Sequence, residues 1–312
     1  MLQFRQLRYF VKIVEIGSIS RAAAVVHIAQ PALSKHIADL EGEFGVSLLH
    51  RTSRGVVPTA DGQVLYEEAV KLIRQIEELP AILRSRQGSV EGVVCFGLSS
   101  SMAPAITGKL VALSKAALPQ VTLRFAITDS HSLREKVLAH QLDLAIVFEN
   151  EPIAGFTREV LFRQRLYLLS SSHDKPKNSI TLREICQLPM MLPSPHNVLR
   201  QMLDGKLDEA GLQISPIAES DLFDVHLSAV EEGLGHTILP KGSFSDVAGH
   251  REIMATPIEP PIYLTACIIS ARDRPLSRAA TAVEAQLKIL VQNSMDDANF
   301  EGAEKIDSID AA

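Results

Sequence analysis

The sequence has few cysteines, the residues that form disulfide frameworks and CxxC metal sites. It contains three cysteines, which lie far apart at Cys95, Cys186 and Cys267. Because this number is odd and no CxxC pair occurs, we expect neither a disulfide framework nor a cysteine metal site. Cys95 and Cys267 stand in apolar, strand-like runs and are expected to be core residues. The chain is therefore expected to use no metal and no cofactor.

Long apolar runs are also missing. Hydrophobic residues make up 46% of the 312 positions, which is enough for packed cores in two or three domains. No apolar run reaches the roughly 18 residues that a membrane helix needs. Basic residues interrupt the first 17 positions, whereas a signal peptide needs an uninterrupted apolar stretch. We therefore expect a cytoplasmic protein that does not bind membranes.

Positive charge is scarce overall, but it is concentrated near the start of the chain. The net charge is −6, yet residues 1–58 contain seven basic and four acidic residues, a net charge of +3. The rest of the chain therefore carries −9. A basic region on an acidic body suits the binding of a polyanion such as DNA at one end of the protein. The small excess further predicts that two or more copies bind together.

Residues 18–62 show the pattern of two helices joined by a turn and followed by a basic wing. Apolar residues recur at helical spacing in two neighbouring segments: Ile19, Ala22, Ala23 and Val26, then Leu33, Ile37, Leu40 and Phe44. Proline is favoured at the first position of a helix, so the pair Gln30-Pro31 predicts where the second helix begins. The residues left facing outward are Gln30, Ala32, Ser34, Lys35 and His36. Such side chains suit contacts with base edges and phosphates, so the pattern predicts a DNA-reading surface.

A heptad pattern follows the wing. Thr59 can cap a helix whose apolar residues are spaced by alternating steps of four and three: Leu65, Ala69, Leu72, Ile76, Leu79 and Leu83. Packing within one domain would also use such a stripe, but a small winged domain has little surface left to bury. Pairing between two chains is therefore favoured. Pro80 predicts an end or a kink near Leu79, and residues 84–92 have the composition of a hinge.

Apolar strand-like runs then alternate with helical segments, which predicts parallel sheets with crossover helices in an α/β fold. The expected strands of the first set are 93–98, 121–127 and 142–148, with helices through residue 113 and over 133–140. The second set comprises strands 161–170, 190–192, 214–218 and 237–239, with helices near 181–186, 198–210 and 222–232. Strand 262–270 and helix 277–291 are expected to return to the first lobe. The polar, acidic end of the chain predicts a disordered tail.

The N-terminal residues resemble the winged helix-turn-helix of the LysR-type transcriptional regulators. The resemblance is carried by Ala22-Ala23, Ala29 to Ser34, Ile37, Leu40-Glu41, Gly45, Leu48, Arg51, Arg54, Thr59 and Gly62. Within that family the sequence is most similar to regulators of nitrogen and sulfur assimilation or of aromatic catabolism. The resemblance implies a long linker helix and a two-lobed effector domain that is like a periplasmic binding protein.

This resemblance sets the expected domain boundaries. They are a winged helix-turn-helix domain at 1–58, a dimerising linker helix and hinge at 59–89, an effector domain at 90–293, and an acidic, disordered tail at 294–312. Within the effector domain, lobe I comprises 90–160 and 268–293, and lobe II comprises 161–267.

The resemblance also assigns DNA contacts. Gln30, Pro31, Ser34 and Lys35 are expected in the major groove, with His36 on the same helix. Arg51, Thr52 and Arg54 would form the wing, while Ser20 and Arg21 would contact phosphate. The family usually has Ser or Thr where this chain has Ala29, so the hydroxyl cap of the recognition helix is missing. A second departure is Leu49-His50, where the family has Phe, which alters core packing.

Open parallel sheets bind ligands at the carboxyl ends of their strands. This rule selects Ser99, Ser100, Ser101, Met102, Thr128 and Phe148 in lobe I, and Ser194, His196, Asn197 and Phe223 in lobe II. Hydroxyl groups and free helix N–H groups there suit a small anion. Each of these residues could equally be an ordinary cap or turn residue, and their convergence on one cleft is implied by the resemblance.

The favoured interpretation is a sequence-specific transcriptional regulator whose activity is modulated by a small, anionic metabolite bound between the two lobes. Its expected partners are double-stranded DNA with a pseudo-palindromic operator, the effector, further copies of itself as a dimer or tetramer, and RNA polymerase. A solute-binding protein with an N-terminal extension is the alternative, and the groove-reading pattern opposes it. No GxSxG, HExxH or phosphate-binding glycine loop occurs, so an enzyme is the poorest fit.

Overall fold

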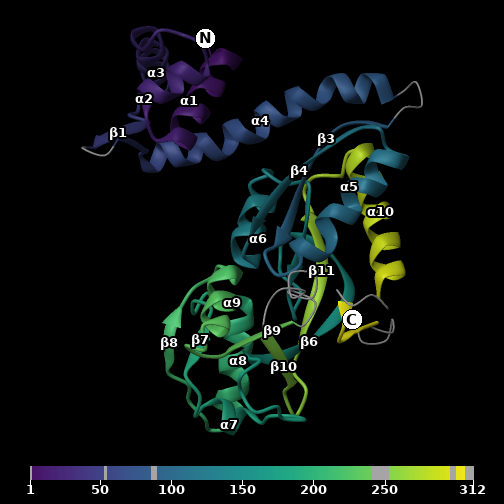
Figure 1. The fold of residues 1–312 in the computed structure, drawn as a ribbon. Coiled ribbons are helices and arrows are strands. Elements are labelled where there is room, and N and C mark those ends of the chain that lie inside the picture. Colours follow the sequence, from purple (N-terminus) through teal and green to yellow (C-terminus); the bar gives the residue numbers. More distant parts are fainter. Residues whose placement is uncertain (1, 53–54, 86–89, 241–252, 296–299, 306–312) are drawn as a thin grey trace. The chain divides into compact units, whose positions relative to one another are not determined.

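The computed structural model describes residues 2–52, 55–85, 90–240, 253–295 and 300–305, and the chain forms two compact units. The N-terminal unit comprises Met1–Arg86 with Ala139–Gln141, and the C-terminal unit comprises Gln87–Leu138 with Leu142–Ala312 (Figure 1). Among the described residues, no helix is long and apolar enough to cross a membrane.

The N-terminal unit contains a three-helix cluster, a two-stranded wing and a long helix. Its elements are α1 (Phe4–Ile16), α2 (Ile19–Val25), α3 (Gln30–Phe44), β1 (Leu49–Thr52), β2 (Gly55–Pro58) and α4 (Ala60–Ser85). The Ser18 side chain caps α2, whereas Ala29 at the start of α3 provides no side-chain cap, as the sequence predicts. The Thr59 hydroxyl accepts a hydrogen bond from the backbone N–H of Gly62 at 2.9 Å, so the predicted cap of α4 is present.

One apolar core holds α1, α2 and α3 together. Its fully buried residues include Phe10, Ile13, Leu33 and Leu40. A Cβ atom at Gly62 would lie 1.9 Å from the carbonyl oxygen of Leu48, so only glycine allows α4 to begin this close to the wing.

Helix α4 differs from expectation in two ways. An end or a kink was predicted near Leu79; the helix does not end there but continues through Pro80 to Ser85, so the first residues of the predicted hinge are helical. A proline costs the helix one backbone hydrogen bond, which a 26-residue helix tolerates near its end. The second difference concerns the heptad stripe, of which Leu65 and Ala69 pack against Leu7 and Val11 of α1. The stripe is free only in its later part, at Leu72, Ile76, Leu79 and Leu83.

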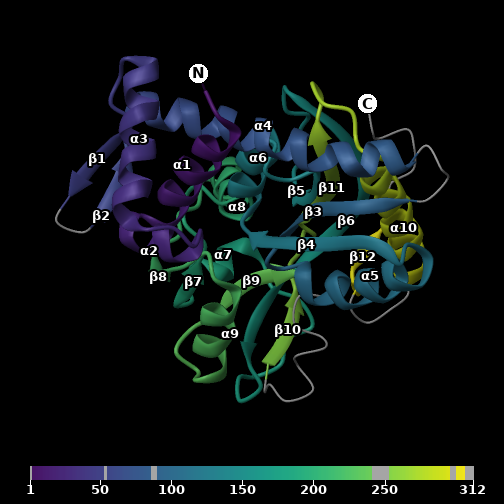
Figure 2. The same cartoon turned by 90° about the horizontal axis from the view of Figure 1, so that it is seen from above.

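Lobe I of the C-terminal unit is built on parallel strands. Its elements are β3 (Glu91–Ser99), α5 (Ala103–Ala117), β4 (Gln120–Thr128), α6 (Ser130–Leu138), β5 (Leu144–Phe148) and α10 (Arg278–Ser294). Strand β3 pairs in parallel with both β4 and β5. Apolar residues of α5 and α10 join the same core as Val94 and Phe96, while α6 packs against the opposite face through Leu133 and Val137 (Figure 2).

Lobe II is smaller and has shorter elements. They are α7 (Leu182–Ile185), β7 (Met190–Leu192), α8 (Val198–Glu209), β8 (Pro216–Glu219), α9 (Phe223–Glu231), β9 (Thr237–Pro240) and β10 (Ile253–Pro257). Strands β7 and β8 pair in parallel, as the alternating pattern predicts, whereas β9 pairs antiparallel with β6, contrary to that prediction. Strand β10 was not expected from the sequence.

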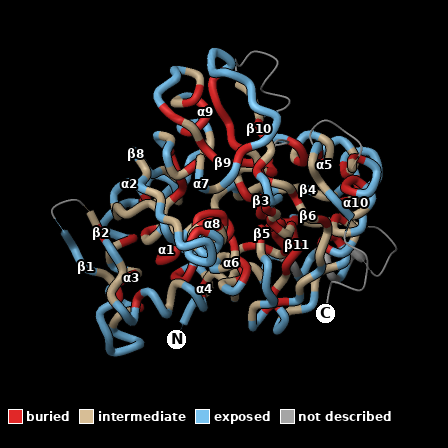
Figure 3. Tube along the Cα trace, turned by 90° about the horizontal axis from the view of Figure 1, so that it is seen from below, coloured by how far each residue is buried: buried red, intermediate tan, exposed pale blue. Residues whose placement is uncertain are grey.

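Two antiparallel strands connect the lobes. Strand β6 (Phe156–Ser171) pairs with β11 (Tyr263–Ala271) over most of its length, and its last residues pair with β9 and β10 of lobe II. The sheet order is β10-β6-β11-β5-β3-β4; central strand β5 is buried at every residue, whereas edge strand β4 has no buried residue (Figure 3). This arrangement agrees with a two-lobed α/β domain with crossing strands.

The last described residues, 300–305, are ordered, contrary to the expectation of a disordered tail. Strand β12 (Ala303–Glu304) pairs with β6, and the Arg165 backbone N–H donates to the carbonyl of Gly302 at 2.9 Å. Phe300 is only 2% exposed and lies edge-to-face with Phe162, with ring centroids 5.4 Å apart. A single apolar anchor outweighs the acidic composition of this segment.

Candidate DNA interface and ligand pocket

The expected DNA-contact residues lie on the outside of the N-terminal unit. Seven of them are exposed: Ser20, Arg21, Gln30, Pro31, Lys35, Arg51 and Thr52. Ser34 and His36 are half-buried, and Arg54 lies outside the described residues. The exposed set comprises amide and basic groups on α2, α3 and the wing strand β1.

Helix α3 gives this surface its order. The Gln30 amide nitrogen donates to the Ser34 hydroxyl at 3.0 Å, so these two side chains occupy one face, one turn apart. His36 instead lies beside Tyr9, with ring centroids 5.2 Å apart. The His36 ring therefore packs against α1, whereas Gln30 is exposed at the start of α3.

The wing is tied to α3 by a residue for which the sequence suggested no role. The Glu41 carboxylate accepts hydrogen bonds from the backbone N–H groups of Leu48 and Leu49, at 2.8 and 3.4 Å. At the other end of β1, the Thr52 hydroxyl donates to the carbonyl of Gly55 at 3.1 Å. The strand that carries Arg51 is thereby fixed to the recognition helix.

The C-terminal unit contains a small pocket between its two lobes, with a cavity volume of about 50 Å³. It lies where β3, β4 and β5 of lobe I and β7, β8 and β9 of lobe II end. Of the expected effector residues, the lining includes Ser99, Ser100, Ser101, Phe148, Asn197 and Phe223. The carboxyl-end rule therefore brings residues from both lobes to one place.

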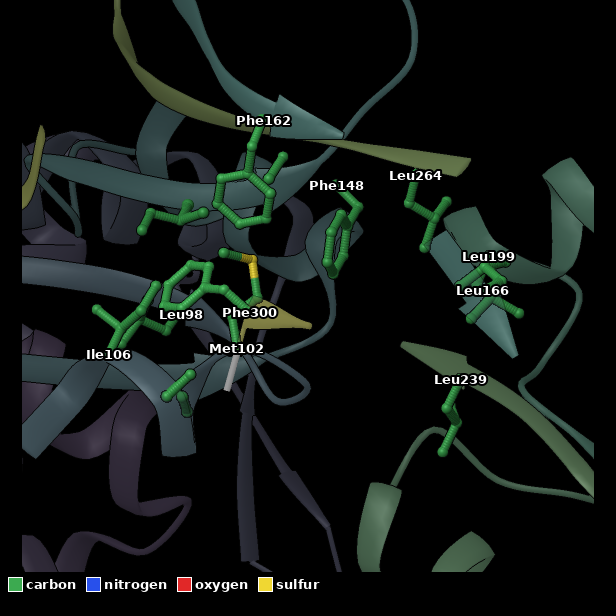
Figure 4. Packing of buried hydrophobic residues seen from close by; sticks show 14 of the residues in the cluster. Leu98, Met102, Ile106, Phe148, Phe162, Leu166, Leu199, Leu239, Leu264 and Phe300 are labelled. Carbon is green, nitrogen blue, oxygen red and sulfur yellow. The ribbon is translucent and has the colours of Figure 1, made fainter. Parts of the chain in front are cut away.

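Four expected residues do not line this pocket. Met102 is buried in the core of lobe I with Leu98 and Ile106 (Figure 4). His196 is exposed. Thr128 and Ser194 lie one step back, because each donates a hydrogen bond to a carboxylate of the lining.

Several lining residues were missed by the sequence analysis. They are Asp129, Ser130, Pro193, Val198, Leu199, Ser220, Asp221, His226, Leu239, Pro240 and Leu264. Asp129 follows Thr128 directly, and Ser220 with Asp221 follows a predicted strand, so a consistent use of the carboxyl-end rule would have found these three. Leu264 belongs to crossing strand β11 and has no such signal.

Asp129 directly precedes α6, and hydrogen bonds from both sides hold its carboxylate in place. It accepts hydrogen bonds from the Ser132 backbone N–H at 2.9 Å, the Ser132 hydroxyl at 2.6 Å and the Thr128 hydroxyl at 3.1 Å. Partial burial raises the pKa of Asp129, but these hydrogen bonds outweigh it and leave the pKa below its usual value. The side chain is therefore negatively charged at neutral pH.

Asp221 plays the matching part in lobe II. Its Oδ1 accepts hydrogen bonds from the Asn197 side-chain amide at 3.0 Å and from the Ser194 backbone N–H at 3.2 Å. The Asn197 side chain in turn caps α8 by accepting from the Leu199 backbone N–H. Asp221 thus fixes the loop that precedes α8.

His226 closes the pocket from α9. Its Nε2 lies 2.5 Å from the carbonyl oxygen of Ser220, which can only accept, so Nε2 carries a proton. Its Nδ1 lies 2.8 Å from the Thr237 hydroxyl, which is free to donate to it. Burial lowers the pKa of His226 despite the opposing effects of Ser220 and Asp221, so the ring is neutral at neutral pH.

Comparisons with known proteins match both units. Residues 4–63 match the family described as bacterial regulatory helix-turn-helix protein, lysR family. Residues 87–290 match the LysR substrate binding domain.

Individual relatives span nearly the whole chain. The nitrogen assimilation regulatory protein nac of Klebsiella aerogenes is 34% identical over 93% of this chain and 95% of its own length. Its namesake in Escherichia coli (strain K12) is 35% identical over 80% of this chain and 81% of its own length. Among solved structures, CbnR, a LysR family transcriptional regulator, covers 95% of this chain and 100% of its own, with a TM-score of 0.68 at 19% identity.

Proposed function

Because this chain belongs to the LysR family of bacterial helix-turn-helix regulators, we propose that it is a transcriptional regulator that reads DNA through α3 and the wing. The observation that carries this proposal is the exposed face of α3. There Gln30 and Ser34 stand one turn apart above a fully buried core, with Arg51 on the attached wing. In this role Gln30 and Ser34 contact bases, while Arg51 and Thr52 contact the backbone.

The pocket between the lobes is the site for a small effector. Residues of both lobes and of the crossing strand β11 line the pocket. A ligand there therefore contacts both lobes, whose relative angle it can change. A ligand that binds one arrangement of the lobes more tightly shifts the protein toward that arrangement. Such a shift would couple ligand binding to DNA binding. Ser99, Ser100, Ser101, Phe148, Asn197 and Phe223 are its direct contacts in this proposal.

The active form is a homodimer or tetramer. The free part of the α4 stripe, Leu72, Ile76, Leu79 and Leu83, is the pairing surface that supports this step. Two-fold pairing of two DNA readers matches a pseudo-palindromic operator, and RNA polymerase is the partner through which the regulator would act in the cytoplasm. The similarity to nac further suggests target genes of nitrogen assimilation.

Binding-site selection tests this function. Purified full-length protein is incubated with a randomised duplex library, and the bound duplexes are enriched and footprinted. We expect a consensus of two half-sites separated by one helical turn, or a multiple of it, with affinity that falls steeply as salt rises. Recovery of unenriched, random duplexes would refute sequence-specific reading by this chain.

A further inference from the structure

The charged groups of the pocket differ from those expected for an anion site. Each lobe contributes one carboxylate: Asp129 stands at the end of β4 in lobe I, and Asp221 follows β8 in lobe II. The described part of the lining contains no lysine or arginine. His226 adds no positive charge, because burial keeps it neutral.

Both carboxylates are held by hydrogen bonds from their own lobe, and Asp221 keeps acceptor capacity for a ligand. A carboxylate offers about four acceptor sites, and those of Asp129 are taken by Ser132, by Thr128 and by its own backbone N–H. Both recorded hydrogen bonds to Asp221 go to Oδ1, and within the described residues none is recorded for its Oδ2. Each aspartate is therefore fixed in place by its own lobe; Asp129 offers a ligand its negative charge, and Asp221 offers its charge and a free oxygen.

This arrangement has a consequence for lobe movement. Two negative charges on opposite lobes repel each other when the lobes approach, and the repulsion is strongest when water is excluded from between them. An anionic ligand would add a third negative charge. A positively charged nitrogen between the two carboxylates would reverse the sign of the interaction and favour approach of the lobes.

We propose that the effector carries a protonated amine that lies between Asp129 and Asp221, and that it is a zwitterion of the amino-acid class. This inference rests on the proposed function of the pocket as the effector site. The serine hydroxyls of Ser99, Ser100 and Ser101 line the same pocket just before α5 and can donate to the carboxylate of such a molecule. Apolar side chains complete the enclosure for the rest of the ligand: Phe148, Phe223, Leu239 and Leu264 (Figure 4 labels Phe148, Leu239 and Leu264).

The test measures ligand binding by the full-length protein. Its probes are the proteinogenic amino acids, each at millimolar concentration, with their deaminated carboxylates as matched partners, for example glutarate for glutamate and propionate for alanine. Thermal shift finds the binders and calorimetry gives their Kd. We expect at least one amino acid to bind and its deaminated partner to bind at least about ten-fold more weakly, as the loss of a charge-assisted hydrogen bond implies.

Two substitutions separate charge from shape. Asp129→Asn and Asp221→Asn keep an oxygen that can accept the existing backbone hydrogen bonds, but they remove the negative charge. Each should weaken the amino acid about ten-fold or more and leave the deaminated partner unchanged or bound more tightly. Asp208→Asn, on α8 and outside the lining, is the matched control and should change neither Kd.

Equal binding of both members of every pair, or no binding by any amino acid, would overturn the proposal. So would a pair of Asn variants that bind amino acids as well as the wild type does. Gel shifts without ligand on the same preparations report DNA binding separately. A protein that binds its selected site but no amino acid would refute this ligand class and leave the proposed regulator intact.

Discussion

The two candidate sites of this protein are built in opposite ways. The DNA face is assembled from side chains between Ser20 and Thr52, seven of the nine described ones exposed, on one pair of helices and a hairpin. The pocket draws its residues from positions 99 to 264, at the ends of six strands and on a crossing strand. The DNA face presents basic and amide groups, whereas the pocket contains two carboxylates.

This difference has a functional meaning. A surface that reads DNA has to keep a fixed shape, so it lies on short helices over a single core. A site that responds to a ligand has to change shape, so it lies between two bodies that share only a few strands. The opposite charges also keep the acidic pocket from competing for the phosphates that the N-terminal unit binds.

The largest expected effect concerns dimerisation, which brings the DNA faces of two chains together. Leu72→Asp places an unpaired charge in the exposed stripe of α4, which should prevent pairing of two chains. Loss of the second reader should weaken operator binding by about 100-fold to 10,000-fold. Light scattering and gel shifts measure both consequences.

Val64→Asp is the matched control, because Val64 is exposed on the same helix but lies off the stripe. It should leave both assembly and DNA affinity unchanged. Wild-type protein that is monomeric at micromolar concentration would contradict the pairing surface.

The next effect should appear only in the C-terminal unit. Phe300→Ala removes a buried ring that packs edge-to-face on Phe162, which should lower the free energy of unfolding of that unit by about 3–5 kcal/mol. Chemical denaturation should show a shift in this unit and none in the N-terminal unit. Leu138→Ala, an exposed leucine of the same unit, should cost far less; an equal loss for both would show that Phe300 is not an anchor.

Phe300 also shows where sequence reasoning reaches its limit. Helical spacing around Leu33 and Leu40 was enough to predict the helix-turn-helix, because its core is formed by residues close in sequence. One phenylalanine in an acidic tail gives no periodic signal, and its burial depends on Phe162, which lies more than a hundred residues earlier. Short edge strands such as β10 and β12 are missed for the same reason, since only their pairing with β6 defines them.

The pocket residues could be predicted in part. Strand ends were predictable from apolar runs, so Ser99 to Ser101 and Asn197 could be selected. The rule selects the residues around each strand end, such as Thr128 with Asp129, but which of two neighbours faces the pocket depends on the turn after the strand. Thus Thr128 was selected where Asp129 lines the site, and Met102 was selected although it turns into the core.

A third prediction compares two kinds of contact within the DNA face. Gln30→Ala should cost about 1–3 kcal/mol at the selected site and relax its sequence preference, because it removes a base contact. Arg51→Ala should weaken all duplexes alike and reduce the salt slope by about one unit. Gel shifts on selected and random duplexes at several salt concentrations distinguish the two. Unchanged discrimination by the Gln30 variant would refute its role.

A fourth prediction compares a residue in the pocket with one behind it. Ser100→Ala deletes a hydroxyl of the lining and should weaken ligand binding by about 1.5–3 kcal/mol if that hydroxyl contacts a charged group. Thr128→Val keeps the shape and acts through Asp129, so its cost should be about 0.5–1.5 kcal/mol. Both variants should bind DNA normally without ligand. A normal ligand response in both would place the effector elsewhere, and loss of basal DNA binding would show that these residues serve the fold.

The smallest effect is a dependence of stability on pH in the C-terminal unit. Burial lowers the pKa of both His226 and His236 from the ordinary value of 6.5, in each case against the raising effect of a nearby aspartate. The unfolded chain therefore binds protons at a higher pH than the folded unit does. Since protons then favour the unfolded state, the free energy of unfolding should fall as the pH drops below 6.5 and level off once the folded rings are protonated. Asp129 acts in the same direction only below its ordinary value of 3.8, so the two effects are separate. Denaturation of the full-length protein at a series of pH values, together with NMR titration of the imidazole protons, measures this. His236→Gln should remove part of the slope, and a transition of the C-terminal unit that is flat between about pH 7.5 and 5 would contradict the burial of these rings.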